Sequence, residues 1–73
     1  MKNIERELKT YMAYHGVTQK ELSDLIGVTP KTFNYKLRGV DNAVFTINEA
    51  RLIVHRLAIP LEKAVEIFFN SEQ

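Results

Sequence analysis

The residue types between positions 30 and 38 suit binding to an anionic polymer better than they suit bond-breaking chemistry. This segment holds three cations and no acidic residue: Lys31, Lys36 and Arg38. Such a balance lowers the free energy of approaching phosphate groups, because each lysine or arginine beside a phosphate releases condensed counterions. Lys36 and Arg38 are therefore predicted to contact phosphate, and the amide of Asn34 is expected to reach the sugar-phosphate backbone as well.

Charge is unevenly distributed along the chain. The formal net charge is only +1, but residues 1–40 contain seven Lys/Arg against four Asp/Glu, whereas residues 41–73 contain three against five. The first part of the chain is therefore the basic one. Two solvated surfaces of different composition would give the same asymmetry, so charge supports a nucleic-acid partner without deciding it.

The sequence offers little material for catalysis or metal binding. It has two histidines, His15 and His55, and it has no cysteine, no glycine-rich phosphate loop and no HExxH-like spacing. Acids that lie close together, such as Glu62 and Glu66, have helical spacing among lysines and arginines, as on solvated helix faces. We therefore expect a protein that is not an enzyme and that has no catalytic residue, metal site, cofactor or small-molecule ligand.

Length and composition predict one domain over residues 1–73. A chain of this size buries only about 60% of its unfolded surface, so it needs a well-patterned core. The lack of cysteine fits a reducing compartment, no apolar run approaches the roughly 20 residues of a membrane span, and the first residues are charged up to Lys9. We expect a cytoplasmic protein without a membrane partner.

Capping residues divide the first half of the chain into predicted helices. Asn3 as N-cap and Gly16 as terminator indicate a helix over about 3–15. The sequence Thr-Gln-Lys-Glu from residue 18 matches a capping box and starts a second helix, which ends at Gly27.

A third helix is predicted over about 30–38. Thr29 can act as N-cap, Pro30 occupies the first helical position, where its missing N–H costs nothing, and Gly39 ends the segment. The outward positions of this helix are the ones that carry the polar and charged side chains described above.

The second half of the chain contains a loop and two further predicted helices. Residues 39–45 are expected to form a loop in which Val44 and Phe45 turn inward as anchors. A second capping box, Thr-Ile-Asn-Glu from residue 46, starts a helix over about 47–57, and the Ile-Pro pair before residue 61 breaks and restarts the pattern, giving a helix over about 60–69. The fold class is therefore all-α with five helices.

The last predicted helix has more apolar surface than one core-facing side requires. We expect its core side to consist of Leu61, Ala64, Val65 and Phe68. Ile67 and Phe69 then remain as contacts with a second copy of the chain. The alternative is an apolar tail that frays or folds back over the first helix.

The stretch from Val17 to Gly39 resembles the Cro/CI-type repressors of phages and their bacterial relatives. It has that family's glutamine at the start of the second helix (Gln19), its Gly-Val turn at 27–28, and its apolar residue in the middle of the third helix (Phe33). The segments Phe-Thr-Ile-Asn-Glu and Leu-Ala-Ile-Pro-Leu-Glu-Lys look like the fourth and fifth helices of small phage repressor-like proteins. The resemblance implies a five-helix, lambda-repressor-like DNA-binding domain whose helix-turn-helix spans residues 18–39.

The resemblance also implies a role for individual residues. Gln19 matches the family's phosphate-contacting glutamine, and Asn42 lies in the loop that offers groups to phosphate in related repressors. The positions that the family uses on base edges are Pro30, Lys31, Thr32 and Tyr35. Among them Lys31 can reach guanine O6 and N7, Thr32 can offer a hydroxyl or a methyl, and Tyr35 can place its ring against a thymine methyl. The alternative is that each of these residues is a solvated residue on an exposed helix face and has no role in binding.

As a whole, the resemblance implies a repressor that binds a double-stranded DNA operator as a homodimer, in a bacterial or phage-infected cell. The chain departs from the family at Met12 and Leu37, where many members have an internal Arg–Glu pair. We expect these two apolar side chains to touch in the core, because one hydrophobic contact avoids the desolvation cost of a buried ion pair. A protein-interaction module that kept this fold, such as an antirepressor or an adaptor, is the alternative function.

Overall fold

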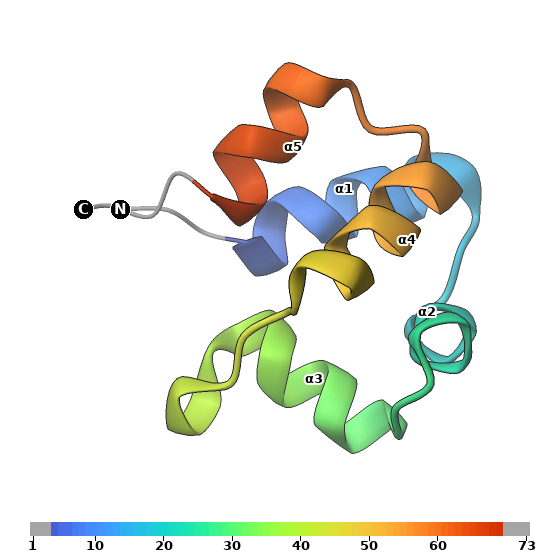
Figure 1. Cartoon of the computed structure of the whole chain (residues 1–73). Coiled ribbons are helices and arrows are strands. Elements are labelled where there is room, and N and C mark those ends of the chain that lie inside the picture. Colours follow the sequence, from blue (N-terminus) through green and yellow to red (C-terminus); the bar gives the residue numbers. More distant parts are fainter. Residues whose placement is uncertain (1–3, 70–73) are drawn as a thin grey trace.

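Five α-helices and no strand make up residues 4–69, the part of the chain that this computed structural model describes (Figure 1). They are α1 (Ile4–His15), α2 (Gln19–Ile26), α3 (Pro30–Arg38), α4 (Ile47–Leu57) and α5 (Leu61–Phe68), with one 3-10 turn, η1 (Val40–Asn42), after α3. The all-α class is confirmed, and the predicted N-cap Asn3 lies outside the described residues. Across this range, every helix is too short or too polar to cross a lipid bilayer.

The helix ends are fixed by the capping residues that the sequence predicts. The hydroxyl of Thr18 accepts a hydrogen bond from the backbone N–H of Glu21, whose carboxylate accepts one from the N–H of Thr18 at 2.8 Å. Thr46 and Glu49 form the same reciprocal pair at the start of α4. Gly39 ends α3 in the left-handed conformation (φ 73°), which a residue without Cβ adopts at little cost.

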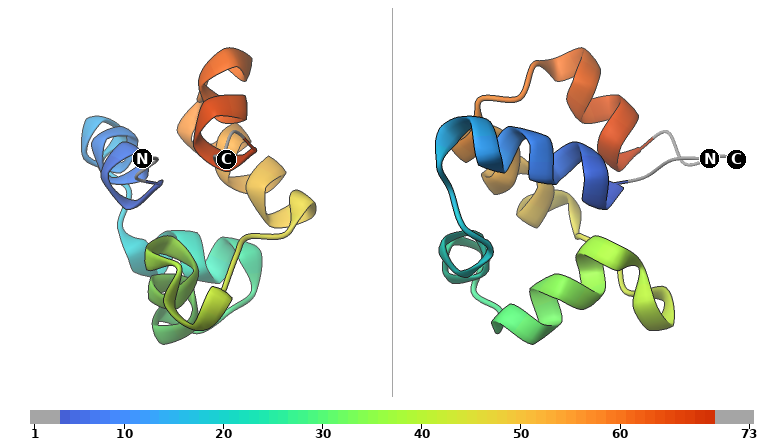
Figure 2. Two further views of the ribbon diagram at one scale, coloured as in Figure 1. Left: turned by 90° about the vertical axis from the view of Figure 1, so that its left-hand side faces the viewer. Right: turned by 180° about the vertical axis from the view of Figure 1, so that it is seen from behind.

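The helices form two layers around one core. In the left-hand view of Figure 2, α2 and α3 lie below, while α1 lies on one side above them and α4 and α5 lie on the other. Within this arrangement, α2 packs against α3 and α4, and α1 packs against α3, α4 and α5. As a result, one side of α3 faces away from the other four helices.

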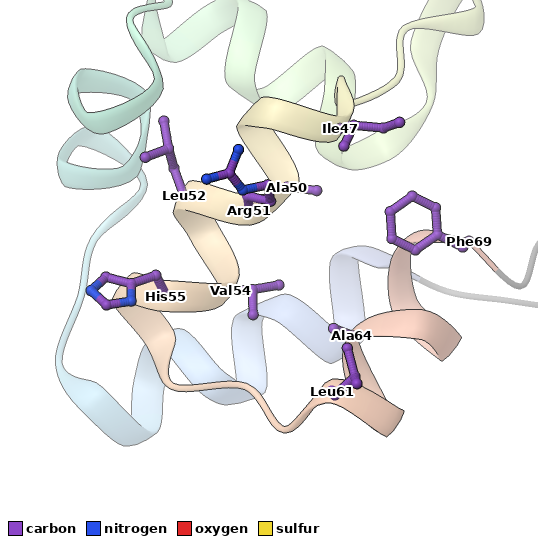
Figure 3. A pocket seen from close by; sticks show the side chains of 9 residues that line it. All are labelled: Ile47, Ala50, Arg51, Leu52, Val54, His55, Leu61, Ala64 and Phe69. Carbon is purple, nitrogen blue, oxygen red and sulfur yellow. The ribbon is translucent and has the colours of Figure 1, made fainter.

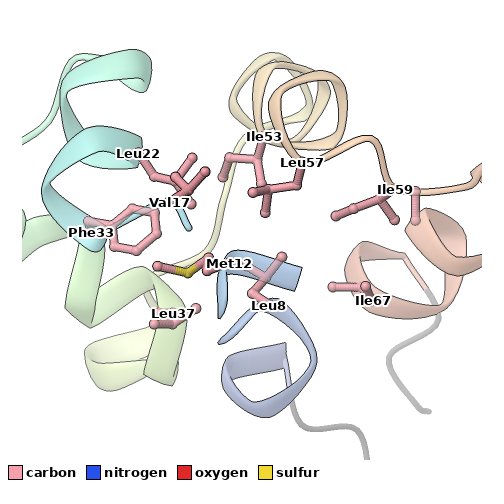
Figure 4. Packing of buried hydrophobic residues seen from close by; sticks show 11 residues of the cluster. Leu8, Met12, Val17, Leu22, Phe33, Leu37, Ile53, Leu57, Ile59 and Ile67 are labelled. Carbon is pink, nitrogen blue, oxygen red and sulfur yellow. The ribbon is translucent and has the colours of Figure 1, made fainter. Parts of the chain in front are cut away.

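The core lies between these layers and takes residues from every helix (Figure 4). Phe33 of α3 is fully buried, as are Leu8 of α1, Leu22 of α2, and Ile53 and Leu57 of α4. Burying an aliphatic or aromatic side chain of this size contributes about 1.5–3 kcal/mol, so these residues hold α3 firmly to the rest of the molecule.

Met12 and Leu37 are both buried in this same core, as predicted from the sequence. Their exposed fractions are 6% and 3%, and Figure 4 draws them next to each other between α1 and α3. Both residues therefore belong to the buried cluster through which α1 packs against α3.

The loop after α3 differs from the prediction at Val44. Phe45 is half-buried and packs against the core as expected, but the side chain of Val44 is 70% exposed. The backbone around Ala43 is extended, and successive side chains of an extended segment point to opposite sides. Because Phe45 points inward, Val44 must point outward.

The prediction for α5 is confirmed for Ala64 and Phe68, which pack in or against the core, and is wrong for three other residues. Ile67, expected as a contact with a second copy, is 2% exposed and belongs to the core, whereas Leu61 and Val65, expected in the core, are 78% and 46% exposed. The reason is that α5 packs against α1 through the side that carries Ala64 and Ile67, which leaves its side toward α4 open. Phe69, the other predicted contact, is more than half exposed.

Candidate nucleic-acid interface

The exposed side of α3 displays the residues that the sequence singles out. Phe33 and Leu37 point into the core, and successive residues of an α-helix are rotated by about 100°, so positions 31, 35 and 38 fall on the opposite side. The side chains of Lys31, Thr32 and Arg38 are exposed, as is Pro30 at the first turn, and Asn34 and Tyr35 are half-buried. The core thus fixes which side of the helix is presented.

Lys31 and Tyr35 form one unit on this side. The Lys31 ammonium lies 5.8 Å from the centroid of the Tyr35 ring, within the range of a cation–π interaction. One helical turn separates the two residues, so the ring supports the lysine and limits its rotamers. A lysine restrained in this way loses less conformational entropy when it contacts a base edge or a phosphate.

Asn34 and Arg38 form a second unit one turn apart. The Arg38 guanidinium donates a hydrogen bond to the Asn34 side-chain oxygen at 3.2 Å. Arg38 belongs to the last turn of α3, where a cation also interacts favourably with the helix dipole. The pair places an oriented, exposed guanidinium at the C-terminal end of α3, whereas Lys31 lies near the N-terminal end of the same outward side.

The hydroxyls of Thr29 and Thr32 meet at the N-terminal end of α3. The Thr29 hydroxyl donates to the Thr32 hydroxyl at 3.1 Å and accepts from the backbone N–H of Thr32 at 3.1 Å. Thr32 therefore takes part in the helix cap, and because its hydroxyl only accepts in this pair, its O–H can still donate to another surface.

Lys36, which the sequence predicts to contact phosphate, is less exposed than Lys31 and Arg38. Its ammonium lies 2.7 Å from a carboxylate oxygen of Glu49 on α4, and the two side chains are only 15% and 14% exposed. The physical reason is its position on the helix: residue 36 follows Phe33 by three residues, so it lies on the flank toward α4 and not on the outward side. In the described structure Lys36 is therefore paired with a carboxylate of α4, unlike the other two cations of α3, and its contact with phosphate stays a prediction.

Glu49 is the residue that sequence reasoning missed. Its capping box was a sufficient explanation for a glutamate at that position, and a separation of 13 residues across a loop gives no periodic signal for an ion pair with Lys36. Burial raises the pKa of Glu49, but the hydrogen bonds from Lys36 and from the Thr46 N–H, together with the positive charge of Lys36, outweigh it and hold the pKa below its ordinary value of 4.5.

The two predicted phosphate contacts outside α3 lie at the start of α2 and in the turn after α3. Gln19 is the first residue of α2 and is half-buried. Asn42 ends η1, is exposed, and has a left-handed backbone (φ 62°), as does its neighbour Asp41 (φ 56°). Asn and Asp tolerate this conformation better than other residues with a Cβ. The carboxylate of Asp41 makes the loop less favourable for phosphate than α3.

A second surface feature lies on the other side of the molecule from α1. A groove of about 570 Å³ runs between α4 and α5 (Figure 3). Leu61 and Phe69 line it from the α5 side, and Ile47, Arg51 and His55 line it from α4. Ile47 is 68% exposed, so the groove is an open apolar surface with an arginine at its edge.

Residues 4–69 contain no group of three or more His, Cys, Asp or Glu side chains placed to hold a metal ion. Comparison of the chain with protein-family models, with curated proteins and with solved structures found no match.

Proposed function

We propose that the protein is a sequence-specific, double-stranded DNA-binding regulator of transcription, and that it acts as a simple repressor of the small phage type. In this proposal α2 and α3 form a helix-turn-helix in a lambda-repressor-like domain, with α3 in the major groove. The observation that carries it is the outward side of α3, which combines exposed Lys31 and Arg38 with Tyr35 and has no acidic residue. The protein then has a binding role without chemistry of its own.

The major groove is about 12 Å wide and admits one α-helix, so the side of α3 opposite Phe33 would face the base edges. Lys31 and Thr32, near the N-terminal end, are the proposed base contacts, with Pro30 and Tyr35 beside them. Arg38 and Asn34 at the other end are proposed to contact phosphate, and Gln19 and Asn42 would add contacts from α2 and from the loop.

Selection of bound duplexes from a random library tests this function directly. A DNA-binding regulator should enrich one short motif, and its affinity for that motif should exceed its affinity for mixed-sequence duplex by at least about 1,000-fold. Binding should also weaken steeply with salt, because counterions are released. An unenriched library, or affinity that does not depend on salt, would contradict the proposal.

Two copies of the chain are expected to bind one operator. A single small module buries roughly 600–1,000 Å² on DNA, and pairing doubles this surface and matches two half-sites about 34 Å apart. The groove between α4 and α5 is the proposed contact. Residues of α4 and α5 line this groove, and in the left-hand view of Figure 2 these two helices lie above the layer of α2 and α3. Pairing there would leave both copies of α3 free to face the same way.

The occupant proposed for this groove is α5 of the second copy. Leu61 and Phe69 line the groove and are 78% and 56% exposed. Val65, four residues from each of them, is 46% exposed. The acids Glu62 and Glu66 follow the outer side of α5, whereas Arg51 lies on the α4 edge. In an antiparallel pairing these acids would approach the partner's Arg51, so both apolar surface and charge are complementary.

Sedimentation equilibrium of the free protein and of the operator complex tests the pairing. Leu61→Asp with Phe69→Asp should weaken the dimer, or the second binding step on DNA, by about tenfold or more. Tyr14→Asp is the matched control, because Tyr14 is 82% exposed but lies on α1, away from the groove. One protomer per palindromic site at saturation would argue against pairing, and equal effects of both variants would move the contact elsewhere.

A further inference from the structure

The ion pair between Lys36 and Glu49 differs from every other ion pair described in residues 4–69. Three of the four pairs, Lys9–Glu5, Lys20–Asp24 and Lys63–Glu66, join residues three or four positions apart on one helix, and their side chains are at least 36% exposed. The fourth joins α3 to α4 across the intervening loop, with both side chains about 15% exposed or less. Exposed helical pairs contribute little, whereas a pair withdrawn from solvent is costly to break on one side only.

Glu49 is itself held in place by the start of α4. The carboxylate oxygen that accepts from Lys36 also accepts from the backbone N–H of Thr46 at 2.9 Å, as part of the capping box. The carboxylate is therefore a fixed point on α4 and not the end of a mobile chain. Lys36 lies one residue before the buried Leu37, so the ion pair fixes the flank of α3 next to its core side.

We propose that Lys36 and Glu49 are positioning residues for the outward side of α3: their ion pair sets the rotation of α3 and withholds the Lys36 ammonium from DNA. Of the three cations on the helix, only Lys31 and Arg38 then count toward DNA binding. This inference rests on the proposed function, because it concerns how α3 is presented to a duplex. It differs from a general stabilising role in predicting which cations contribute to the salt dependence.

Two substitutions separate the charges from the other roles of these residues. Lys36→Met removes the ammonium and keeps the apolar stem of the side chain. Glu49→Gln removes the charge but keeps an oxygen that can accept from Thr46, since glutamine also serves in capping boxes. Glu21→Gln is the matched control, because Glu21 has the same place in the capping box of α2 but is exposed and bonds only to Thr18 in the described structure.

The slope of log K against log salt, measured with a mixed-sequence duplex, is the first readout. Each phosphate contact contributes about 0.9 to this slope. Lys36→Met should leave the slope of the wild-type protein unchanged, and Glu49→Gln should steepen it by about 0.9 because it releases Lys36. A slope that becomes shallower by about 0.9 in Lys36→Met would overturn the inference. It would also be overturned if Glu21→Gln steepened the slope as much as Glu49→Gln, because the effect would then come from the loss of a negative charge anywhere on the protein.

The second readout is the ratio of affinities for the selected motif and for mixed-sequence duplex. Glu49→Gln should lower this ratio by about two- to thirtyfold, as expected when a helix that reads bases is less firmly held, and Glu21→Gln should leave it within about twofold. An unchanged ratio in Glu49→Gln would overturn the positioning role. If the wild-type protein binds no duplex at all, the proposed function itself fails; if it binds and these differences are missing, only the positioning role fails.

Discussion

The ring of Phe45 packs on the ring of Phe33 with centroids 5.6 Å apart and a tilt of 60° between the rings. Phe33 is the buried residue in the middle of α3. The ring of Phe45 also contacts the ring of Phe68 of α5 edge to face, with centroids 5.8 Å apart. Offset and edge-to-face contacts are the favoured geometries of aromatic pairs. Phe45, two residues before α4, therefore joins the helix proposed to bind DNA to α5.

Truncation of this residue should destabilise the whole domain. Phe45→Ala is expected to lower the free energy of unfolding by about 3 kcal/mol, the low end of the range for phenylalanine, because the ring is half-buried. Val44→Ala, its exposed neighbour, should change it by less than about 0.5 kcal/mol. Urea denaturation followed by circular dichroism measures both, and similar values for the two variants would disprove the role of the ring.

Lys31→Ala should impair recognition of one base pair. We expect a loss of about 1–3 kcal/mol in binding to the selected motif and relaxed preference at a single position, because a base-edge contact is removed. Competition binding against a panel of motif variants measures this. A uniform loss across the whole panel would instead assign Lys31 to phosphate.

Arg38→Ala should weaken binding to all duplexes to about the same extent. The guanidinium is exposed and oriented by Asn34, so its loss is expected to reduce the salt slope by about one unit without changing base preference. Titrations at several salt concentrations with both the motif and mixed-sequence duplex provide the test. A sequence-selective effect would contradict the assignment to phosphate.

Ala58→Gly should stabilise the protein. Ala58 ends α4 in the left-handed conformation (φ 51°), where a Cβ costs about 1–2 kcal/mol, and its N–H caps the helix by bonding to carbonyl groups of α4. After the entropy cost of glycine in the unfolded chain, a gain of about 0.5–1 kcal/mol is expected. Ala13→Gly, inside α1, should instead lower the free energy of unfolding. An Ala58→Gly variant no more stable than the wild-type protein would refute the strain at Ala58.

Stability should fall in acid partly through Glu49. Burial raises the pKa of this carboxyl, but Lys36 and Thr46 lower it by more, so the folded protein has a pKa below the ordinary 4.5. A lowered pKa stabilises the fold above 4.5, and this contribution is lost as pH falls through the folded value. The difference in unfolding free energy between the wild-type protein and Glu49→Gln should therefore shrink as the pH falls from neutral to below 4.5; a difference independent of pH would contradict this.

The helices could be predicted from the sequence because their ends are determined locally. Thr18 with Glu21, and Thr46 with Glu49, satisfy backbone groups within four residues, so the pattern and the geometry coincide. The outward side of α3 was equally predictable, since Phe33 and Leu37 alone set which side is buried.

The remaining features depend on contacts between helices that no local pattern specifies. Ile67 is buried and Leu61 is exposed, the reverse of the prediction, because α5 packs against α1 at a particular rotation. Most sides of α5 are apolar enough to be buried, so its sequence does not specify that rotation. Lys36 is turned from solvent by Glu49, which is 13 residues away and lies on another helix. Helical spacing predicts which residues share a face but not which face meets which neighbour.

The amide NMR spectrum of the protein titrated with its selected duplex tests the central claim most directly. We expect the largest shifts on α3, from Lys31 to Arg38, with smaller ones at Gln19 and Asn42, while the amides of α1 from Glu5 to Tyr11 remain unchanged. Shifts confined to α4 and α5, or a spectrum unchanged by duplex at low salt, would contradict DNA binding through α3.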